Sequence, residues 1–183
     1  MYKRQDQDQV KRLVGKLTDL EELADIIIID TGAGISPSVM EFLLASPETI
    51  VVTTPEPTSV TDSYALLKAL SMNEGYNKDE CTIKIVANRV ESENEGRNLY
   101  EKLNAVVSKF LGIKLEYLGS VPQDSSVRKA VMKQKPVTIV YPASSAARHF
   151  KRIAADLLGN ENDVPENKKG IRSYFKNVFA RKM

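Results

Sequence analysis

The residue most clearly suited to a chemical role in this sequence is Asp30, which ends a run of four consecutive isoleucines. A run without polar alternation is typical of a parallel strand buried on both faces, so residues 25–30 are predicted to form one. A carboxylate at the tip of such a strand can hold Mg²⁺, usually through water, beside nucleotide phosphates. Gly32 and Gly34 follow, and glycine lets backbone N–H groups approach a phosphate and move when it leaves. The same pattern also occurs in ordinary turns, so the motif alone leaves both interpretations open.

Further apolar segments alternate with helix-like stretches along the chain. Strands are predicted at residues 49–54, 82–87 and 115–121, with a short fifth strand at 137–141. Helices are predicted at residues 6–22, 37–45, 58–74, 93–111, 125–133 and 143–158. Ser36 before Pro37 predicts an N-cap with a first-turn proline, and Asp124 can cap the helix that follows it. This alternation predicts an α/β fold with a doubly wound, mostly parallel sheet and right-handed crossovers.

Such sheets bind ligands beyond the carboxyl ends of their strands. The loops expected at that edge are Asp30 to Gly34, Thr53 to Pro57, Asn88 with Arg89, and Pro122 to Asp124. The prolines of the Thr53 to Pro57 loop have a purely structural explanation too, because proline commonly ends a strand and begins the following helix. These loops form the predicted rim of a ligand site.

Four segments carry a resemblance that is specific in combination and in order. They read DIIIIDTGAGIS, IVVTTPEPTSVTDSYALLKAL, IVANRV, and LGSVPQDSSVRKAV with a following KPV. Together they resemble the MinD/ParA branch of P-loop ATPases, and the second is most similar to the FlhG group, also called FleN or YlxH. The resemblance covers approximately residues 8–158.

The resemblance implies ATP and Mg²⁺ as cofactors and assigns roles to individual positions. Asp30 matches the Walker B aspartate, which holds Mg²⁺ through water, and Gly32 and Gly34 match the switch II loop. Asn88 matches the asparagine that reads the adenine edge, for which its amide offers a donor and an acceptor. Pro122 and Asp124 match the segment that closes over the base. The loop with Thr54 and Pro55 matches one beside the nucleotide.

The phosphate-binding loop that this family uses has no match in the sequence. Nothing resembles G-x-x-x-x-G-K-[ST], and the one Gly-Lys pair, Gly15-Lys16, lies in a helical pattern. The expectation is an N-terminally truncated chain lacking two or three βα units, or roughly 60–90 residues. Residues 1–5 are expected to be a non-native leader, and residues 6–158 a partial ATPase domain. We expect this chain alone to bind ATP poorly and not to hydrolyse it, which calorimetry can test.

The C-terminal segment has the pattern of an amphipathic helix at residues 170–183, after a polar linker at 159–169. Its apolar residues recur at helical spacing, and basic residues occupy the other positions. The apolar stripe is Ile171, Tyr174, Phe175, Val178 and Phe179, and Arg172 and Lys176 are among the basic residues. This pattern predicts binding to an anionic membrane surface. The alternatives are docking on the protein's own core and, less favoured, binding to nucleic acid.

Composition and charge limit the class of protein. The chain has 183 residues, a net charge of +2 and a single cysteine, Cys81, which excludes an internal disulfide. No apolar run approaches the ~20 residues that span a bilayer, and Met1 to Gln5 lacks the apolar region of a signal peptide. We therefore predict a cytoplasmic protein, peripheral to the inner face of the cell membrane.

The function that the resemblance implies is that of a regulatory ATPase controlling flagellar number or placement. The intact protein would dimerise on ATP and could have FlhF-type GTPases and flagellar switch proteins as partners. Two alternatives stay open within the same fold class: a MinD-like division-site ATPase and a ParA-like partitioning protein, for which DNA would be the partner. A third alternative is a non-catalytic membrane adaptor without a phosphate-binding loop. The basic, apolar C-terminal helix argues against the DNA partner.

Overall fold

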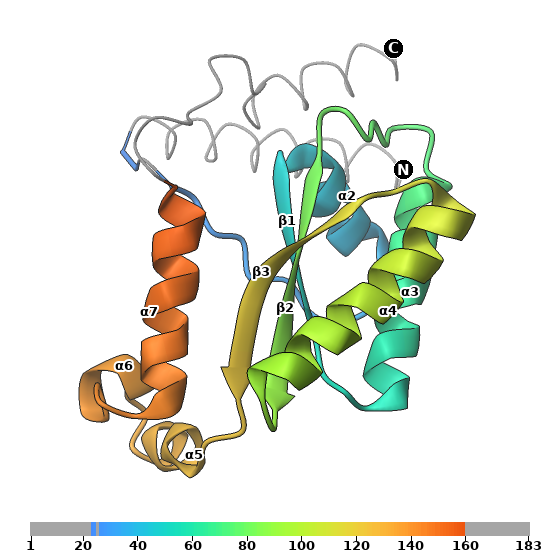
Figure 1. Cartoon of the computed structure of the whole chain (residues 1–183). Helices are drawn as coiled ribbons and strands as arrows, with labels where there is room; N and C mark the ends of the chain where they lie inside the picture. The colour runs from blue at the N-terminus through green and yellow to red at the C-terminus, as the bar shows by residue number, and fades with distance from the viewer. Residues whose placement is uncertain (1–22, 25, 160–183) are drawn as a thin grey trace. The chain divides into compact units, whose positions relative to one another are not determined.

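The computed structural model describes residues 23, 24 and 26–159 (Figure 1). The helices predicted at 6–22 and 170–183 lie outside the described residues, as do residues 160–169 of the predicted linker. Residues 48–166 form one compact unit and residues up to 47 belong to a second, so each is described on its own. Among the described residues, no helix combines the length and apolar composition needed to cross a membrane.

A parallel sheet forms the centre of the larger unit. Its strands are β1 (Glu48–Thr53), β2 (Thr82–Val90) and β3 (Leu115–Pro122), in the spatial order β1-β2-β3. Val51 is opposite Ile85, and Ile83 is opposite Leu115. Parallel strands in sequential order require a crossover after each strand, which confirms the predicted α/β class.

Helices cover both faces of this sheet (Figure 1). The crossover helices α3 (Pro57–Ser71) and α4 (Glu93–Leu111) lie on one face, and α7 (Ser145–Leu158) packs on the other. Two short helices, α5 (Ser125–Met132) and α6 (Val137–Val140), connect β3 to α7.

The buried side chains alternate between two clusters along the strands, as a pleated sheet requires. On the α7 side, Val86 packs with β3 residues and with Ala146 and Ile153 of α7. On the α4 side, Ala87 packs with Val90 and Leu99. The sheet therefore has an apolar layer on each face, which explains its unbroken hydrophobic runs.

One glycine sets how closely α4 approaches the sheet. Gly96 is buried in the first turn of α4, and a Cβ added there would lie 2.8 Å from the Cβ of Ser120. It would also lie 3.3 Å from the Cβ of Ala87, so both neighbouring strands limit the space. The hydroxyl of Ser120 is buried and has no hydrogen-bond partner among the described residues. This contact is dry and tight.

Strand β1 is the open edge of the described sheet. Its side chains alternate, with Thr49, Val51 and Thr53 buried on the α3 side. On the opposite face Ile50 and Val52 expose 42% and 58% of their surface. The edge strand therefore leaves an apolar strip uncovered within the described part of the chain.

The helix boundaries confirm most of the predicted elements. In the smaller unit, α2 spans Pro37–Ala45, and the Ser36 side chain accepts a hydrogen bond from the Val39 N–H, as its N-cap position predicted. In the larger unit, α4 has the predicted bounds, and the other helices differ at their ends by one to three residues.

Two predicted strands are wrong. The isoleucine run belongs to no strand in the described residues 26–30, because a strand needs neighbouring backbone groups to pair with and this segment has none there. The strand predicted at 137–141 is the helix α6, in which the Val140 and Ile139 N–H groups both donate to the Pro136 carbonyl. In each case the apolar, β-branched composition favoured a strand, and the available backbone partners decided the structure.

Candidate nucleotide-binding site

Asn88 lies near the carboxyl end of β2, opposite Val121 of β3. Its side-chain oxygen accepts a hydrogen bond of 3.0 Å from the N–H of Arg89, which fixes the amide's orientation. Its amide nitrogen donates to no group among the described residues, and the oxygen keeps a second lone pair. The side chain can therefore offer a donor and an acceptor side by side to a ligand beyond the strand.

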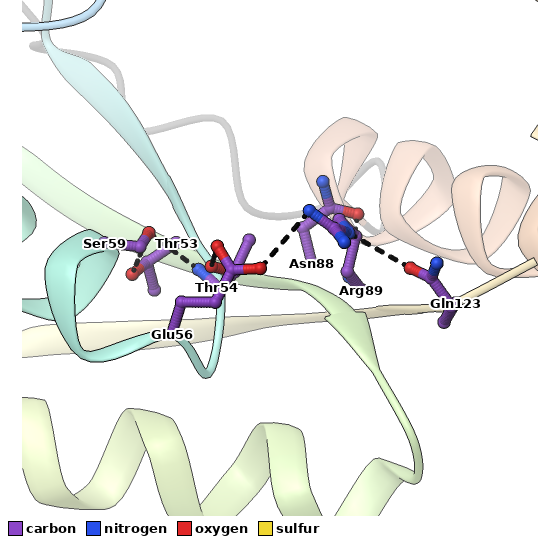
Figure 2. A network of polar contacts seen from close by, with 7 residues as sticks. All are labelled: Thr53, Thr54, Glu56, Ser59, Asn88, Arg89 and Gln123. Atoms are coloured by element: carbon purple, nitrogen blue, oxygen red, sulfur yellow. Dashed lines mark hydrogen bonds and ion pairs between the residues drawn. The ribbon is translucent and has the colours of Figure 1, made fainter. Parts of the chain in front are cut away.

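Arg89 connects three loops of the rim (Figure 2). Its Nε donates to Oε1 of Gln123 over 3.1 Å, and its Nη1 lies 3.3 Å from Oε1 of Glu56. Glu56 follows β1 and Gln123 follows β3, so one guanidinium spans the loops on both sides of β2. The backbone of Arg89 is left-handed, with φ of 57°, a conformation that few non-glycine residues adopt.

The loop that contains Thr54 and Pro55 is held by hydroxyl groups (Figure 2). The N–H of Thr54 donates to Oγ of Ser59 over 3.0 Å, and that Oγ lies 3.2 Å from the Thr53 hydroxyl. The Thr54 hydroxyl donates to Glu56 over 3.1 Å. Ser59 in the first turn of α3 therefore folds the loop back onto the strand end, which the two prolines alone would not do.

The loop from Pro122 to Asp124 is anchored to the structure at both ends. The N–H of Gln123 donates to the Val90 carbonyl over 2.9 Å. Asp124 caps α5 by accepting from the Ser126 N–H at 2.8 Å, as predicted, and its other oxygen accepts from the Ala146 N–H at 3.1 Å. These bonds, first of all that from Ala146, hold the pKa of the Asp124 carboxyl below its ordinary value. Asp124 thus joins the beginnings of two helices.

A second link at this edge joins α4 to α7. Glu93, in the first turn of α4, forms an ion pair with Arg152 of α7, and its Oε1 lies 3.3 Å from Nε2 of His149 on the same helix. The hydrogen bond from Arg152 is the main reason why the pKa of Glu93 lies below its ordinary value. The helices on opposite faces of the sheet are therefore tied together beside the candidate site.

The structure brings five predicted site residues to one edge of the sheet in the larger unit. They are Thr54, Pro55, Asn88, Pro122 and Asp124. Asp30, Gly32 and Gly34 belong to the other unit, and their approach to this edge stays a prediction. Gly34 has φ of +103°, which requires glycine, and Asp30 is exposed to solvent.

An adenine base fits the donor and acceptor that Asn88 presents, since adenine offers N6–H and N7 as the matching pair. A metal ion has a weaker basis in the described residues, which contain no group of three histidine, cysteine, aspartate or glutamate side chains that could hold one. Asp30 alone would suit only a Mg²⁺ that also binds nucleotide phosphates, as is usual for this ion. The described residues of the larger unit therefore fit a purine base, and a Mg²⁺ ion at Asp30 stays a prediction.

Comparison with known proteins decides the family. No protein-family model matches the chain. Over 163 residues, or 89% of its length, the chain is 39% identical to the antiactivator FleN of Pseudomonas aeruginosa. The chain is of the MinD/ParA type and is close to FlhG. The flagellum site-determining protein YlxH of Helicobacter pylori is 34% identical over 160 residues. The FlhG-like chain covers 56% of that FleN and 52% of that YlxH, about half the length of these relatives.

Solved structures agree with this assignment at the level of the fold. The septum site-determining protein MinD of Pyrococcus horikoshii, complexed with Mg-ADP, matches with a TM-score of 0.60 and 21% identity. The match covers 84% of the FlhG-like chain and 59% of that MinD. The parallel sheet and its helices are therefore those of a MinD/ParA-type fold.

The Arg89 connection and its partners Glu56 and Gln123 are the part of the rim that sequence reasoning missed. The sequence placed all three in rim loops but gave no sign that one side chain joins them. A left-handed arginine has no sequence signal, because glycine, asparagine and aspartate are the residues usually found in that conformation.

Proposed function

We propose that this chain forms part of a regulatory ATPase of the FlhG kind, which controls the number or placement of flagella. Two of its relatives, the antiactivator FleN and the flagellum site-determining protein YlxH, support a regulatory role. ATP-dependent dimerisation and partners among FlhF-type GTPases and flagellar switch proteins belong to the same proposal. The observation that carries the nucleotide role is the Asn88 amide, fixed by the Arg89 N–H with its donor free.

The residues of the rim have distinct roles in this proposal. Asn88 reads the purine edge, the Pro122–Asp124 loop lies against the base, and the Thr54–Pro55 loop borders the nucleotide. Asp30 holds Mg²⁺ through water, and the glycines after it respond to the γ-phosphate. Bound ATP with Mg²⁺ supplies the phosphoanhydride bond, whereas these side chains bind and orient the nucleotide. Arg89 keeps the three loops in register through Glu56 and Gln123.

The first test is the Asn88→Ala variant of the protein produced from its complete gene. Calorimetry measures its affinity for ATP and for GTP. Removing the amide deletes the paired donor and acceptor, so ATP affinity is expected to fall about tenfold, the equivalent of about 1.4 kcal/mol. GTP affinity should change little, because guanine presents two acceptors, O6 and N7, at that edge and has no donor for the Asn88 oxygen. Preference for adenine should thus be lost.

Asn98→Ala is the matched control, since it removes the same amide from an exposed position on α4. It should bind ATP as the unchanged protein does. Equal ATP affinities for Asn88→Ala and the unchanged protein would reject the proposed role of Asn88 in reading the base.

We also propose that residues 170–183 bind the anionic inner face of the cell membrane. The apolar stripe predicted there includes three aromatic residues, and burial of one phenylalanine contributes about 2 kcal/mol. Phe175→Glu is therefore expected to reduce co-sedimentation with phosphatidylglycerol vesicles by more than tenfold. Vesicles of phosphatidylcholine should bind the unchanged chain weakly, because they lack the negative charge.

The control for this experiment is Met72→Glu, which places the same charge on an apolar side chain that is already 74% exposed at the end of α3. Vesicle binding should then change less than twofold. Retained binding in Phe175→Glu would show that the segment packs on the protein itself or has another partner.

A non-catalytic membrane adaptor is the second candidate function, supported by the basic and apolar pattern of residues 170–183. It predicts vesicle binding without any ATP dependence. A MinD-like role at the division site would use the same nucleotide residues with different partners. Genes for flagellar export beside this one would favour the flagellar role, and genes for septum placement would favour the division-site role.

A further inference from the structure

A long stretch of this chain is basic and contains no acidic residue. Residues 125–155 include seven lysines and arginines and no aspartate or glutamate. The whole chain is nearly balanced, with 26 basic and 24 acidic residues, so about four acidic residues would be expected in a stretch of this length. The seven are Arg128, Lys129, Lys133, Lys135, Arg148, Lys151 and Arg152. The positive charge of the chain is therefore concentrated in this stretch.

The fold gathers four of these cations on one surface. Helix α5 turns Ala130 inward, where it is 2% exposed, and Val127 packs against the cluster beneath α7. With 3.6 residues per turn, Arg128 and Lys129 must then face solvent, and Lys133 and Lys135 follow in the exposed turn after the helix. We call the exposed residues of 128–135 together with Ile139 of α6 the α5–α6 surface.

The α5–α6 surface also exposes large apolar side chains. Val131, Met132 and Ile139 have 67%, 80% and 70% of their surface exposed. Single exposed apolar residues are common, but three beside four cations in so short a segment resemble the anchors of an interaction site.

The cations of this surface are free to pair with a partner. Among the described residues, Arg128, Lys129, Lys133 and Lys135 form no ion pair, whereas Lys84, Arg89 and Arg152 each have a glutamate. Lys133 lies over the ring of Tyr141, with its Nζ 5.1 Å from the ring centroid. That contact holds the lysine in place and leaves its charge without a carboxylate.

The shape of this surface is preformed. Gln134 has a left-handed backbone with φ of 52°, and its N–H donates to the Val131 carbonyl over 2.9 Å. The Lys135 N–H donates to the Ala130 carbonyl over 3.2 Å. These bonds define the backbone of the turn between α5 and α6, so the Cα positions that carry the cations and apolar side chains are set before binding. A partner then has less backbone to order when it binds.

We propose that the α5–α6 surface binds an acidic, amphipathic segment of another protein. Its glutamates or aspartates would pair with the free cations, and its apolar side chains would cover Val131, Met132 and Ile139. Nucleic acid is a poorer match, because phosphate contacts do not need three exposed apolar side chains. An anionic membrane surface is the other alternative, and the vesicle measurements in the test below distinguish it from a protein segment.

The test uses the full chain and a synthetic helical peptide of about 18 residues, with leucine at i, i+3, i+4 and i+7 spacing and glutamate elsewhere. A second peptide carries lysine in place of glutamate. Fluorescence anisotropy should show the acidic peptide binding at least tenfold more tightly than the basic one. The affinity should fall as salt is raised from 50 mM to about 500 mM, as expected for exposed charge pairs. Amide chemical shifts should change in α5, in α6 and in the turn between them.

The double variant Lys129→Glu with Lys133→Glu is expected to weaken binding of the acidic peptide at least tenfold. Lys102→Glu with Lys109→Glu on α4 makes the same change of net charge on exposed positions of the opposite layer and should alter affinity less than twofold. Circular dichroism melts of both variants should match that of the unchanged chain, because every substituted side chain is exposed.

Equal loss of affinity in both double variants would overturn the proposal, since net charge alone would then explain binding. Failure of the acidic peptide to bind the unchanged chain would also overturn it. Vesicles of phosphatidylglycerol or duplex DNA would then be the indicated ligand if the unchanged chain binds them and Lys129→Glu with Lys133→Glu abolishes that binding. Peptide binding that persists in Phe175→Glu would separate this surface from the membrane role, so the two proposals can fail independently.

Discussion

Gly96→Val is expected to lower the free energy of unfolding by about 3 kcal/mol, because it overfills a close contact between a helix and the sheet. The first added carbon would lie 2.8 Å from the Ser120 Cβ and 3.0 Å from the Tyr117 hydroxyl. The Ser120 Cβ is attached directly to the backbone of β3, so it cannot move away without displacing the strand, whereas the Tyr117 hydroxyl is the end of a longer side chain. The helix must then rise from the sheet and weaken the packing around Ala87 and Leu99. Urea denaturation followed by circular dichroism measures the change.

Asn98→Val provides the control for this experiment, since it places the same residue two positions along the same helix on an exposed side. Asparagine and valine have similar helix propensities, so the free energy of unfolding should change by less than about 0.5 kcal/mol. Ser120→Ala should be neutral or slightly stabilising, because it removes a buried hydroxyl that has no partner among the described residues. If Gly96→Val were as stable as the unchanged chain, α4 would not approach the sheet as closely as described.

Asp124→Ala is expected to lower the free energy of unfolding by about 3 kcal/mol at pH 7, because two charge-assisted hydrogen bonds are lost together. The N–H groups of Ser126 and Ala146 would lose their acceptor, and Ala146 is fully buried, so water cannot replace the carboxylate there. Asp124→Asn should cost less, since one amide oxygen can still cap α5. Asp156→Ala removes the same charge from an exposed position of α7 and should be nearly neutral.

The effect of Asp124 should depend on pH in a direction that follows from its pKa. The carboxyl has its ordinary pKa of 3.8 in the unfolded chain and a lower pKa in the folded chain. Its stabilisation is therefore complete above the unfolded pKa and is lost as pH falls through the folded one. The difference in unfolding free energy between the unchanged chain and Asp124→Ala should be constant from pH 7 to about 5 and shrink below about pH 4. A difference that grew in acid would contradict the described hydrogen bonds.

Helices that begin with a capping residue or a first-turn proline could be predicted from the local sequence. Ser36 and Pro37 fixed the beginning of α2, and Asp124 fixed the beginning of α5. β2 is three residues longer than predicted because Asn88 and Arg89 interrupt its apolar pattern while its backbone remains paired with β3. Polar residues at the end of a strand lack the apolar pattern from which a strand is predicted, so the predicted strand is too short.

Elements that depend on distant partners were harder to predict. The segment VTIV has strand composition, yet the turn after α5 and the Pro136 carbonyl make it helical. Likewise, the rim residues Thr54 and Asn88 could be predicted from their positions after strands, whereas the roles of Ser59 and Gln123 could not. Those roles depend on which loops the sheet brings together, and that information is absent from any one segment.

The left-handed backbone at Arg89 implies a compromise at the rim. A residue with a Cβ in this conformation costs on the order of 1 kcal/mol, which glycine would avoid. Because Arg89 is more than half exposed, its pairing with Glu56 offsets little of that cost. Glycine would adopt this backbone without that cost, but it would remove the guanidinium that contacts both Glu56 and Gln123, so the rim gives up some stability for a side chain that joins its loops.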